Sequence, residues 1–384
     1  MTTPDEEVLV ARAYLSAVAE PPAPAVCGFV SAHGPVEAAA RVVAGDVPRD
    51  VEDEVQARRG EVSGSALLES ARRAGLRLLT PEHAGDWPTE RFGCFEEATA
   101  IGLAGVAPPL ALWTRGSRSL ARALDRSCAI VGARAASGYG EHVSAEWAHG
   151  LVSAGVTVVS GAAYGIDGAA HRGALAARGS GTDEAHGVTV AFVASGADVD
   201  YPAGHARLLA TVAERGLVLS EYPPATMPRK HRFLVRNRLI AGAGAGTVVV
   251  EAGARSGAGN TASTAESLGR PVMAAPGPVT SASSVGCHAM IRSGKAVLVT
   301  RPDDVLELIN PMGSAPPEQG SPKRVTDEVG SYARRVHEAL WDGASAEQLA
   351  VSTGLPPGKV RAVLPELEFA GLARRGDEGW SRVS

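Results

Sequence analysis

The chain has 384 residues, of which 45% are hydrophobic and 21% are charged, and its formal net charge is −5. This length exceeds that of one ordinary compact domain, and this balance of hydrophobic and charged residues excludes a disordered chain. The net negative charge excludes a uniformly basic nucleic-acid-binding protein, so any site for a polyanion must be a local basic patch.

The four cysteines are scattered, and none forms a Cys-x-x-Cys pair. The sequence therefore indicates no zinc site, no disulfide framework and no cofactor. The start, MTTPDEEVLV, lacks a basic targeting region, and no apolar run approaches the ~20 residues that span a bilayer. We expect a cytoplasmic protein without a membrane partner.

Residues 1–104 have the periodicity of helices. The segments VLVARAYLSAVA, VEAAARVVAG and SALLESARRAGLRLL repeat apolar residues at a spacing near 3.6, and short Pro/Gly breaks separate them. This pattern predicts an N-terminal helical module, in which no residue pattern is typical of a chemical site.

From about residue 105, short apolar runs alternate with alanine-rich helical stretches. The runs are CAIVG (128–132), VTVVSG (156–161), VTVAFVASG (188–196), LVLSEY (217–222), TVVVEAG (247–253), PVMAAPG (271–277) and AVLVT (296–300). This alternation predicts an α/β fold over residues 105–310, with a Rossmann-like parallel sheet covered by helices on both faces. Ligands of such sheets bind beyond the carboxyl ends of the strands.

Residues 311–328 are rich in Pro, Gly and Ser, which predicts a linker. Residues 329–384 then read as helix, turn, helix and a short hairpin near Trp380, which predicts a winged helix-turn-helix-like module. Residues 331–384 carry seven basic and seven acidic side chains. Because phosphate contacts supply most of the affinity for duplex DNA, this neutral module favours a protein-interaction or regulatory role at least as much as weak DNA contact through Lys359 and Arg361.

Three loops at predicted strand ends place glycines just before a helix. Glycine lets the backbone approach a phosphate, and the helix N-terminus supplies oriented N–H groups. The first of these loops, at 131–140, matches neither a dinucleotide nor a triphosphate motif, and it could be a plain turn with a surface arginine. The candidate residues are Arg134 in VGARAASGYG, Ser160 and Gly161 in VVSGAAYG, and Ser256 and Gly257 in EAGARSGAG.

Two further loops allow alternative interpretations. Asp167 and His171 are four residues apart and so share a helix face. They could form a catalytic carboxylate–imidazole pair, but no nucleophile or metal triad accompanies them, which favours a helix-cap acid and a packed histidine. Tyr201, before Pro202, could stack on a base or close the edge of the sheet.

The densest basic segment is MPRKHRFLVRNRLIAG (227–242), which contains no acid. Cations that contact the backbone, combined with a stacking ring, bind single strands without sequence preference. The alternative is a solvated basic segment that pairs with acids elsewhere in the chain. The residues concerned are Arg229, Lys230, Arg232, Arg236 and Arg238, with Phe233 in their middle.

Taken together and in chain order, the loops resemble those of the DNA-processing protein DprA (Smf) family. The motifs that carry the resemblance are VGAR…YG, VVSGAAYGIDGAAH, SGADVDYP, LSEYPP, FLVRNRLIAG, VVVEAGARSG and PGPVTSASSVGCHAMIRSG, over about residues 105–310. The resemblance implies a Rossmann-like core that binds single-stranded DNA, forms a homodimer and loads RecA during natural transformation, without catalysis. It also suggests residues 271–300 as the dimer interface.

Residue by residue, the resemblance implies a phosphate-binding pocket and one base-stacking ring. The phosphate contacts fall on Arg134, Ser160, Gly161, Arg236, Asn237, Arg238, Ser256 and Gly257, and the stacking ring is Phe233. The sequence departs from the family pattern in Leu234 for a proline, Gly259 for a common leucine, His205-Ala206 after the Tyr-Pro motif, and an insertion at 179–186.

The alternative function is a nucleotide phosphoribohydrolase-like enzyme on a related scaffold, with Glu251 as its catalytic acid. Such enzymes carry a P-G-G-x-G-T-x-x-E motif, whereas this chain has AGAGAGTVVVEAG and lacks Pro-Gly-Gly. This difference favours binding over hydrolysis. A third interpretation, a DNA-binding regulator that acts through residues 329–384, is disfavoured by the neutral charge of that module.

Overall fold

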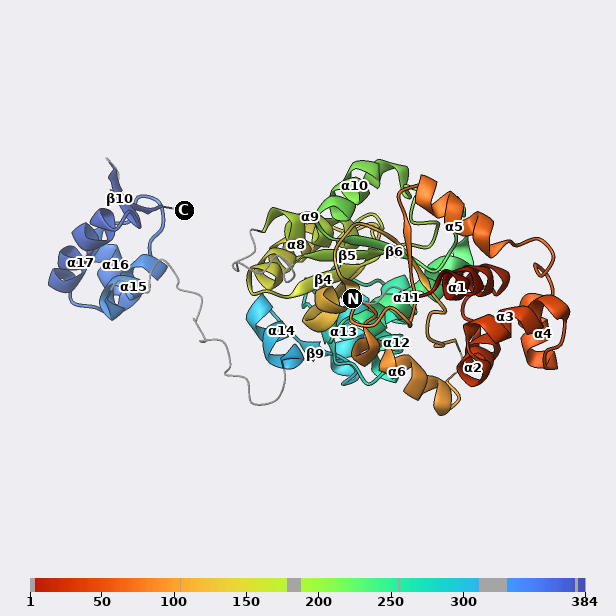
Figure 1. The fold of residues 1–384 in the computed structure, drawn as a ribbon. Helices are drawn as coiled ribbons and strands as arrows, with labels where there is room; N and C mark the ends of the chain where they lie inside the picture. Colours follow the sequence, from red (N-terminus) through yellow and green to blue (C-terminus); the bar gives the residue numbers. More distant parts are fainter. Residues whose placement is uncertain are drawn as a thin grey trace. The chain divides into compact units, whose positions relative to one another are not determined.

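The computed structural model describes residues 4–103, 105–177, 188–254, 256–310, 330–376 and 379–383. By its internal contacts the chain divides into two compact units, Met1–Ala315 and Pro316–Ser384. The predicted insertion at 179–186 and the predicted linker at 311–328 lie outside the described residues. Each unit is described by itself below (Figure 1).

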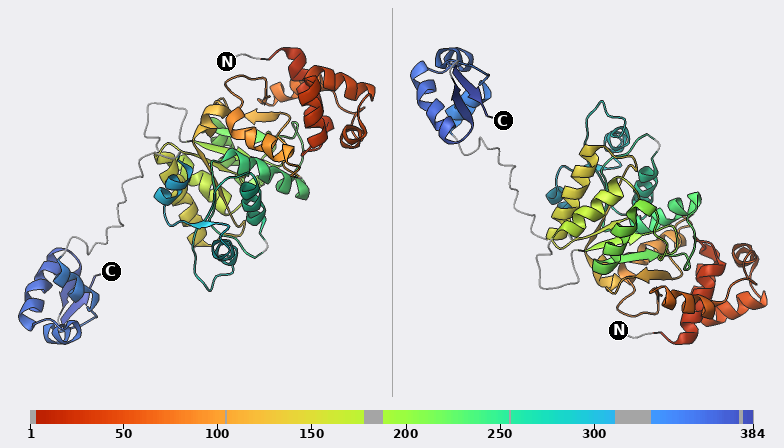
Figure 2. Two further views of the ribbon diagram at one scale, coloured as in Figure 1. Left: turned by 90° about the horizontal axis from the view of Figure 1, so that it is seen from below. Right: turned by 90° about the horizontal axis from the view of Figure 1, so that it is seen from above.

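The N-terminal segment begins with four helices that share a core of their own. They are α1 (Glu6–Val18), α2 (Pro24–His33), α3 (Pro35–Ala44) and α4 (Arg49–Val55), and they lie together in both views of Figure 2. Their buried apolar side chains include Leu15, Phe29 and Val42. The predicted helical character of this segment is confirmed.

The segment SALLESARRAGLRLL is only partly helical. Its helix α5 (Gly64–Arg73) stops before Gly75, whose φ of 69° is left-handed and ends the helix. The following residues form strand β1 (Arg77–Leu79), in which Leu78 and Leu79 are buried. The sequence pattern predicted a helix at these residues, whereas the structure has a strand. The next element is helix α6 (Thr89–Ala100).

All seven predicted strands are present in one sheet. They are β3 (Ser127–Val131), β4 (Thr157–Ser160), β5 (Thr189–Phe192), β6 (Leu217–Ser220), β7 (Thr247–Val249), β8 (Val272–Ala274) and β9 (Val297–Leu298). Among the described residues the strand order is β1-β2-β6-β5-β4-β3-β7-β8-β9. The seven strands are parallel, whereas β2 (Leu112–Arg115) pairs antiparallel with β6 and with β1.

Helices cover both faces of the sheet, as Figure 1 shows. One face packs against α6, α7 (Leu120–Asp125), α11 (Lys230–Ala243), α12 (Gly257–Ser267) and α13 (Val285–Arg292). The other packs against α5, α8 (Gly138–Ser153), α9 (Ile166–Ala176), α10 (Ala206–Arg215), which a short 3-10 turn (Ala203–His205) precedes, and α14 (Pro302–Ile309). Successive strand residues such as Val158 and Val159 belong to opposite cores, as the two-residue period of a strand requires.

The order of the strands reverses at β3. From β3 the chain builds outward through β4, β5 and β6, then returns to place β7 on the other side of β3 and continues to β8 and β9. The loops that follow neighbouring strands diverge at such a switch point, which is where ligands of open α/β sheets bind. The site is therefore expected at the carboxyl ends of β3, β4, β5 and β7.

The second unit has the elements of a winged helix. Helices α15 (Ser331–Glu338), α16 (Ala346–Thr353) and α17 (Pro357–Phe369) precede an antiparallel hairpin of β10 (Ala373–Gly376) and β11 (Gly379–Arg382). Their shared core confirms the predicted module. Among the residues that the structure describes, no helix combines the length and apolarity needed to cross a membrane.

Candidate nucleic-acid interface

The loops that follow β3, β4 and β5 lie next to the first turns of α11, at the carboxyl ends of these strands. Together they line a small, shallow pocket of about 50 Å³. Its lining residues are Arg134, Gly161, Ala163, Tyr164, Val193, Ala194, Tyr201, Pro202 and Phe233. Three sequence-predicted site residues, Arg134, Gly161 and Phe233, are therefore brought together.

Arg134 and Phe233 form the polar and apolar halves of this pocket. The Arg134 guanidinium lies 4.7 Å from the centre of the Phe233 ring, which is a cation–π contact. The Tyr201 ring lies 5.7 Å from Phe233 on a separate loop. Arg134 is exposed and pairs with none of the described carboxylates, so its charge is available to a ligand.

A second exposed aromatic residue, Tyr164, was not predicted as a site residue. Its side chain is 49% exposed, compared with 43% for Tyr201. Its hydroxyl accepts a hydrogen bond from Gly204 N at 3.3 Å, and its ring packs edge-on against His205. Only 4% of the chain is aromatic, so a tyrosine within a glycine-rich strand-end loop was the signal that could have identified it.

Arg236 supports the loop after β4 from the interior of the protein. It is buried, and its Nη1 donates to Gly161 O at 2.8 Å and to Phe192 O. A Cβ at Gly161 would collide with that buried guanidinium, so the close approach favours glycine. Asp167 accepts from Gly161 N at 3.2 Å and completes the support.

Burial shifts the titration of both charged groups beneath Gly161. It lowers the pKa of Arg236 to about 10, although the carboxylate of Asp167 acts in the opposite direction. It also raises the pKa of Asp167, although the positive charge of Arg236 opposes that shift. The two groups therefore act as a buried polar support that satisfies both backbone polar groups of Gly161.

The other predicted phosphate-binding side chains also have internal partners. Arg238 donates to both carboxylate oxygens of Glu221, at 2.5 and 2.6 Å, and to Ala107 O at 3.0 Å. Burial lowers the pKa of Arg238, but Glu221 outweighs that effect and raises it overall. The Ser160 hydroxyl donates to Ile130 O at 2.7 Å. Neither side chain faces the pocket.

The loop after β7 lies on the other side of the switch point. Ser256 caps α12 by accepting from Gly259 N at 3.4 Å, and Gly257 begins that helix. Asn237 connects α11 to this helix start, with its Nδ2 at 3.5 Å from Gly257 O. Ser256 and Gly257 therefore neighbour α11 but do not line the pocket that contains Arg134.

The basic segment before and within α11 divides into exposed and buried cations. Arg229 and Lys230 are exposed, whereas the Arg232 side chain is only 9% exposed and pairs with Glu20 at 2.9 Å. The segment itself contains no acid, but Glu20 and Glu221 reach it from other parts of the chain. Arg232 and Arg238 are therefore paired with acids from other parts of the chain, which was the alternative interpretation of this segment.

The carboxylate of Glu251, just after β7, is held by residues from the loops after β3 and β8. It accepts from Ser137 N at 2.9 Å, Ser137 Oγ at 2.6 Å and Ser283 Oγ at 3.0 Å. Nor do Asp167 and His171 pair with each other, because His171 Nδ1 lies 2.7 Å from Thr189 Oγ1. These contacts are typical of structural groups, and the described residues contain no cluster of potential metal ligands.

Comparison with known proteins places the sheet and the second unit in one family. Residues 97–310 match the family model of the DNA recombination-mediator protein A, and residues 320–379 match the DprA winged helix domain. The chain is 46% identical over 372 residues to a putative DNA processing protein DprA of Mycobacterium tuberculosis, covering 96% of this chain and 93% of the relative. It is 35% identical over 260 residues to protein Smf of Escherichia coli, covering 66% and 67%.

Two solved structures resemble this fold. DNA processing protein A of Streptococcus pneumoniae superposes with a TM-score of 0.61 at 28% identity, covering 79% of this chain and 98% of that one. DNA processing protein A of Helicobacter pylori, described for its single-stranded DNA binding mode, superposes with a TM-score of 0.50 at 25% identity, covering 61% and 96%.

Proposed function

Because the chain belongs to the DNA recombination-mediator protein A family, we propose that it binds single-stranded DNA at the pocket lined by Arg134, Tyr164, Tyr201 and Phe233. The observation that carries this proposal is the contact between the exposed Arg134 guanidinium and the Phe233 ring, with Tyr201 beside them. A cation for the phosphate next to rings for the bases is the combination that single-strand-binding surfaces use. A duplex hides the base faces that these rings would contact.

Within this proposal the predicted site residues take two kinds of role. Arg134, with Arg229 and Lys230, contacts phosphates directly, and Phe233 stacks on a base. Gly257 offers a backbone N–H group at the start of α12, as glycine-rich loops at helix starts do, whereas the N–H of Gly161 is used by Asp167 and Gly161 lines the pocket. Ser160, Arg236 and Asn237 hold those loops in place, and Arg238 fixes α11 to Glu221 and Ala107, which is supported by their internal hydrogen bonds.

We expect Arg134→Ala to weaken binding of a fluorescent single-stranded oligonucleotide by about 10- to 100-fold, because a charge-assisted hydrogen bond is worth roughly 1.5–3 kcal/mol. The slope of log affinity against log salt should also fall by about 0.7, since one phosphate contact is lost. Both quantities are measured by fluorescence anisotropy. Arg122→Ala is the control, because Arg122 is exposed on α7, which leads into the opposite end of β3.

An unchanged affinity and salt slope in Arg134→Ala would contradict the site assignment. Equal losses in Arg134→Ala and Arg122→Ala would mean that net charge rather than this pocket governs binding.

The hydrolase alternative is not favoured, because the carboxylate of Glu251 is engaged by Ser137 and Ser283. Release of free adenine from AMP by the purified chain would revive it.

We further propose that the chain acts as a homodimer and transfers the bound strand to RecA, protecting it until then. The support for the dimer, the transfer and the protection is membership of a recombination-mediator family. Binding through backbone and ring contacts without a covalent step suits such a role, because the strand must be released to the next protein.

A further inference from the structure

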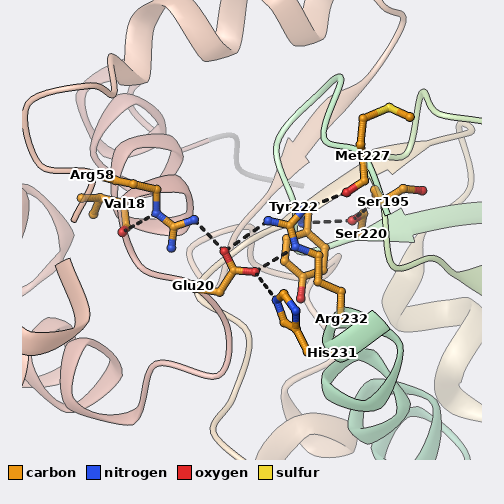
Figure 3. A network of polar contacts seen from close by, with 9 residues as sticks. All are labelled: Val18, Glu20, Arg58, Ser195, Ser220, Tyr222, Met227, His231 and Arg232. Atoms are coloured by element: carbon orange, nitrogen blue, oxygen red, sulfur yellow. Dashed lines mark hydrogen bonds and ion pairs between the residues drawn. The ribbon is translucent and has the colours of Figure 1, made fainter. Parts of the chain in front are cut away.

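Glu20 is the centre of a polar cluster that joins the N-terminal helices to α11. The cluster consists of Glu20, Arg58, His231 and Arg232 (Figure 3). Glu20 Oε1 accepts from Arg232 Nε at 2.9 Å, and its Oε2 lies 3.3 Å from Arg232 Nη2. Arg58 Nη1 donates to Oε2 at 2.6 Å, and His231 Nε2 lies 3.3 Å from Oε1.

The sequence of α11 explains why an acid from elsewhere is needed here. The first turn of this helix contains Lys230, His231 and Arg232 and no acid. A helix N-terminus carries partial positive charge, so three basic side chains there are unfavourable and a nearby carboxylate is stabilising. Glu20, from the loop between α1 and α2, supplies that carboxylate.

The ionisation of Glu20 is secured by its partners. Burial alone would raise its pKa, but the hydrogen bonds from Arg232 and Arg58 outweigh it and lower the pKa to about 2. Glu20 is therefore charged at neutral pH, with its carboxylate shared between two arginines from different parts of the unit.

Arg232 also contacts the segment that leads into α11, and so connects Glu20 to that segment. Its Nη1 donates to Met227 O at 2.9 Å, and its guanidinium lies 4.5 Å from the centre of the Tyr222 ring. With all three guanidinium nitrogens in use and a side chain only 9% exposed, Arg232 is not presented to a ligand. The next residue is Phe233, which contacts Arg134 and Tyr201.

We propose that Glu20 is a positioning residue for strand binding. It fixes the first turn of α11 through Arg232, so that the Phe233 ring stands beside Arg134 and Tyr201 in the geometry that a base requires. This inference rests on the proposed function, because it concerns the same pocket. It also gives the N-terminal helices a part in the site, although their sequence carries no pattern typical of binding.

The test compares Glu20→Gln with Glu82→Gln. Glu82 pairs with Arg12 at side-chain exposures of 29% and 9%, close to the 30% and 9% of Glu20 and Arg232. Both variants remove one negative charge and one arginine pair of equal burial, and Glu20→Gln also removes the contacts with Arg58 and His231. Glu82 has no contact with α11 among the described residues. Affinity for a single-stranded oligonucleotide, its salt slope and the melting temperature are measured for the full chain.

We expect Glu20→Gln to weaken binding by about 5-fold or more, since a misplaced ring loses part of its stacking contact with a base. The salt slope should stay the same, and Glu82→Gln should leave affinity unchanged. In the Phe233→Ala background, Glu20→Gln should have no further effect, because the ring that it positions is absent.

Three results would overturn the inference. Stronger binding with a steeper salt slope in Glu20→Gln would show that Glu20 merely repels phosphates. Equal losses in Glu20→Gln and Glu82→Gln would show a general stability effect, and full additivity with Phe233→Ala would show that the two residues act separately. If Glu20→Gln does not fold, Glu20→Asp replaces it, since the shorter acid keeps the charge and should still weaken binding.

Failure of the underlying function would look different. In that case the unmodified chain would not bind the strand, or Phe233→Ala would bind as tightly as the unmodified chain. Failure of the inference alone would leave strand binding and its dependence on Phe233 intact, with Glu20→Gln indistinguishable from the unmodified chain.

Discussion

At the scale of single residues, the partners of charged side chains decide which of them can meet a ligand. The segment 227–242 holds five cations without a neighbouring acid in sequence, which predicts a basic surface. Arg232 pairs with Glu20, 212 residues away, and Arg238 with Glu221, 17 residues away. A local count of charges cannot detect such tertiary partners, whereas the exposed Arg134 was identifiable from its loop alone.

Buried His171 should make the stability of the Met1–Ala315 unit depend on pH. Burial lowers its pKa to about 3, whereas an unfolded histidine titrates near 6.5. Between these values the unfolded chain binds one more proton, so this contribution is complete above pH 6.5 and is lost as the pH falls toward 3. His171→Gln removes the dependence.

The stability difference between the unmodified chain and His171→Gln should therefore be smaller at pH 5.5 than at pH 7.5, by about 1.4 kcal/mol. Urea unfolding at the two pH values measures it. His149→Gln is the control, because it makes the same replacement at an exposed position on α8. An equal pH dependence in both variants would mean that burial of His171 is not its cause. A difference for His171→Gln that does not change with pH would show that this histidine is not buried in its neutral form.

At the scale of elements, apolar runs followed by helical stretches predicted the parallel strands β3 to β9, because a strand covered on both faces is apolar throughout. The same reasoning missed β1 and β2, which are short and lie outside the alternating strand–helix pattern. Strand β2 is positioned by antiparallel pairing with β6, which is about 100 residues away in sequence, and β1 is positioned by pairing with β2. Tertiary pairing rather than local pattern forms these two strands.

The edge strand β9 is the element on which the proposed homodimer can be tested. Val297 and Leu298 are 50% and 47% exposed on the last strand of the sheet, within the suggested interface at 271–300. An exposed apolar edge strand is prone to pair with another chain. Val297→Lys should therefore convert a dimer into a monomer in sedimentation velocity experiments.

A matched control for the dimer lies in the second unit. Val351 on α16 is 85% exposed, so Val351→Lys introduces the same charge on a surface outside the proposed interface. It should leave the oligomeric state unchanged. A monomeric unmodified chain, or a Val297→Lys variant that remains dimeric, would contradict the assignment of this edge.

At the scale of the whole molecule, a mediator should accelerate the assembly of RecA on a strand. We expect RecA to assemble faster on DNA that carries this chain than on DNA coated with a general single-strand-binding protein. RecA-dependent ATP hydrolysis, which requires the assembled filament, provides the measurement. If the chain delays RecA as much as the general protein does, the proposed transfer is wrong.

The second unit illustrates how far whole-molecule reasoning from sequence extends. Its winged helix was predictable from helical periodicity and turn residues. The cations near the start of α17 are also engaged, since Arg361 pairs with Glu347 and Lys359 lies 4.3 Å from the centre of the Tyr332 ring. These contacts agree with the neutral charge of the module and reduce the number of free cations on α17.

The central claim is that the edge of the sheet around Arg134 and Phe233 holds a DNA strand whose bases are free. Its most direct test is an equilibrium competition between a single-stranded oligonucleotide and its own duplex for the full chain, repeated at several salt concentrations. The account predicts that the single strand binds much more tightly, and that its affinity falls as salt rises while the preference for the strand persists. Equal or tighter binding of the duplex would contradict it.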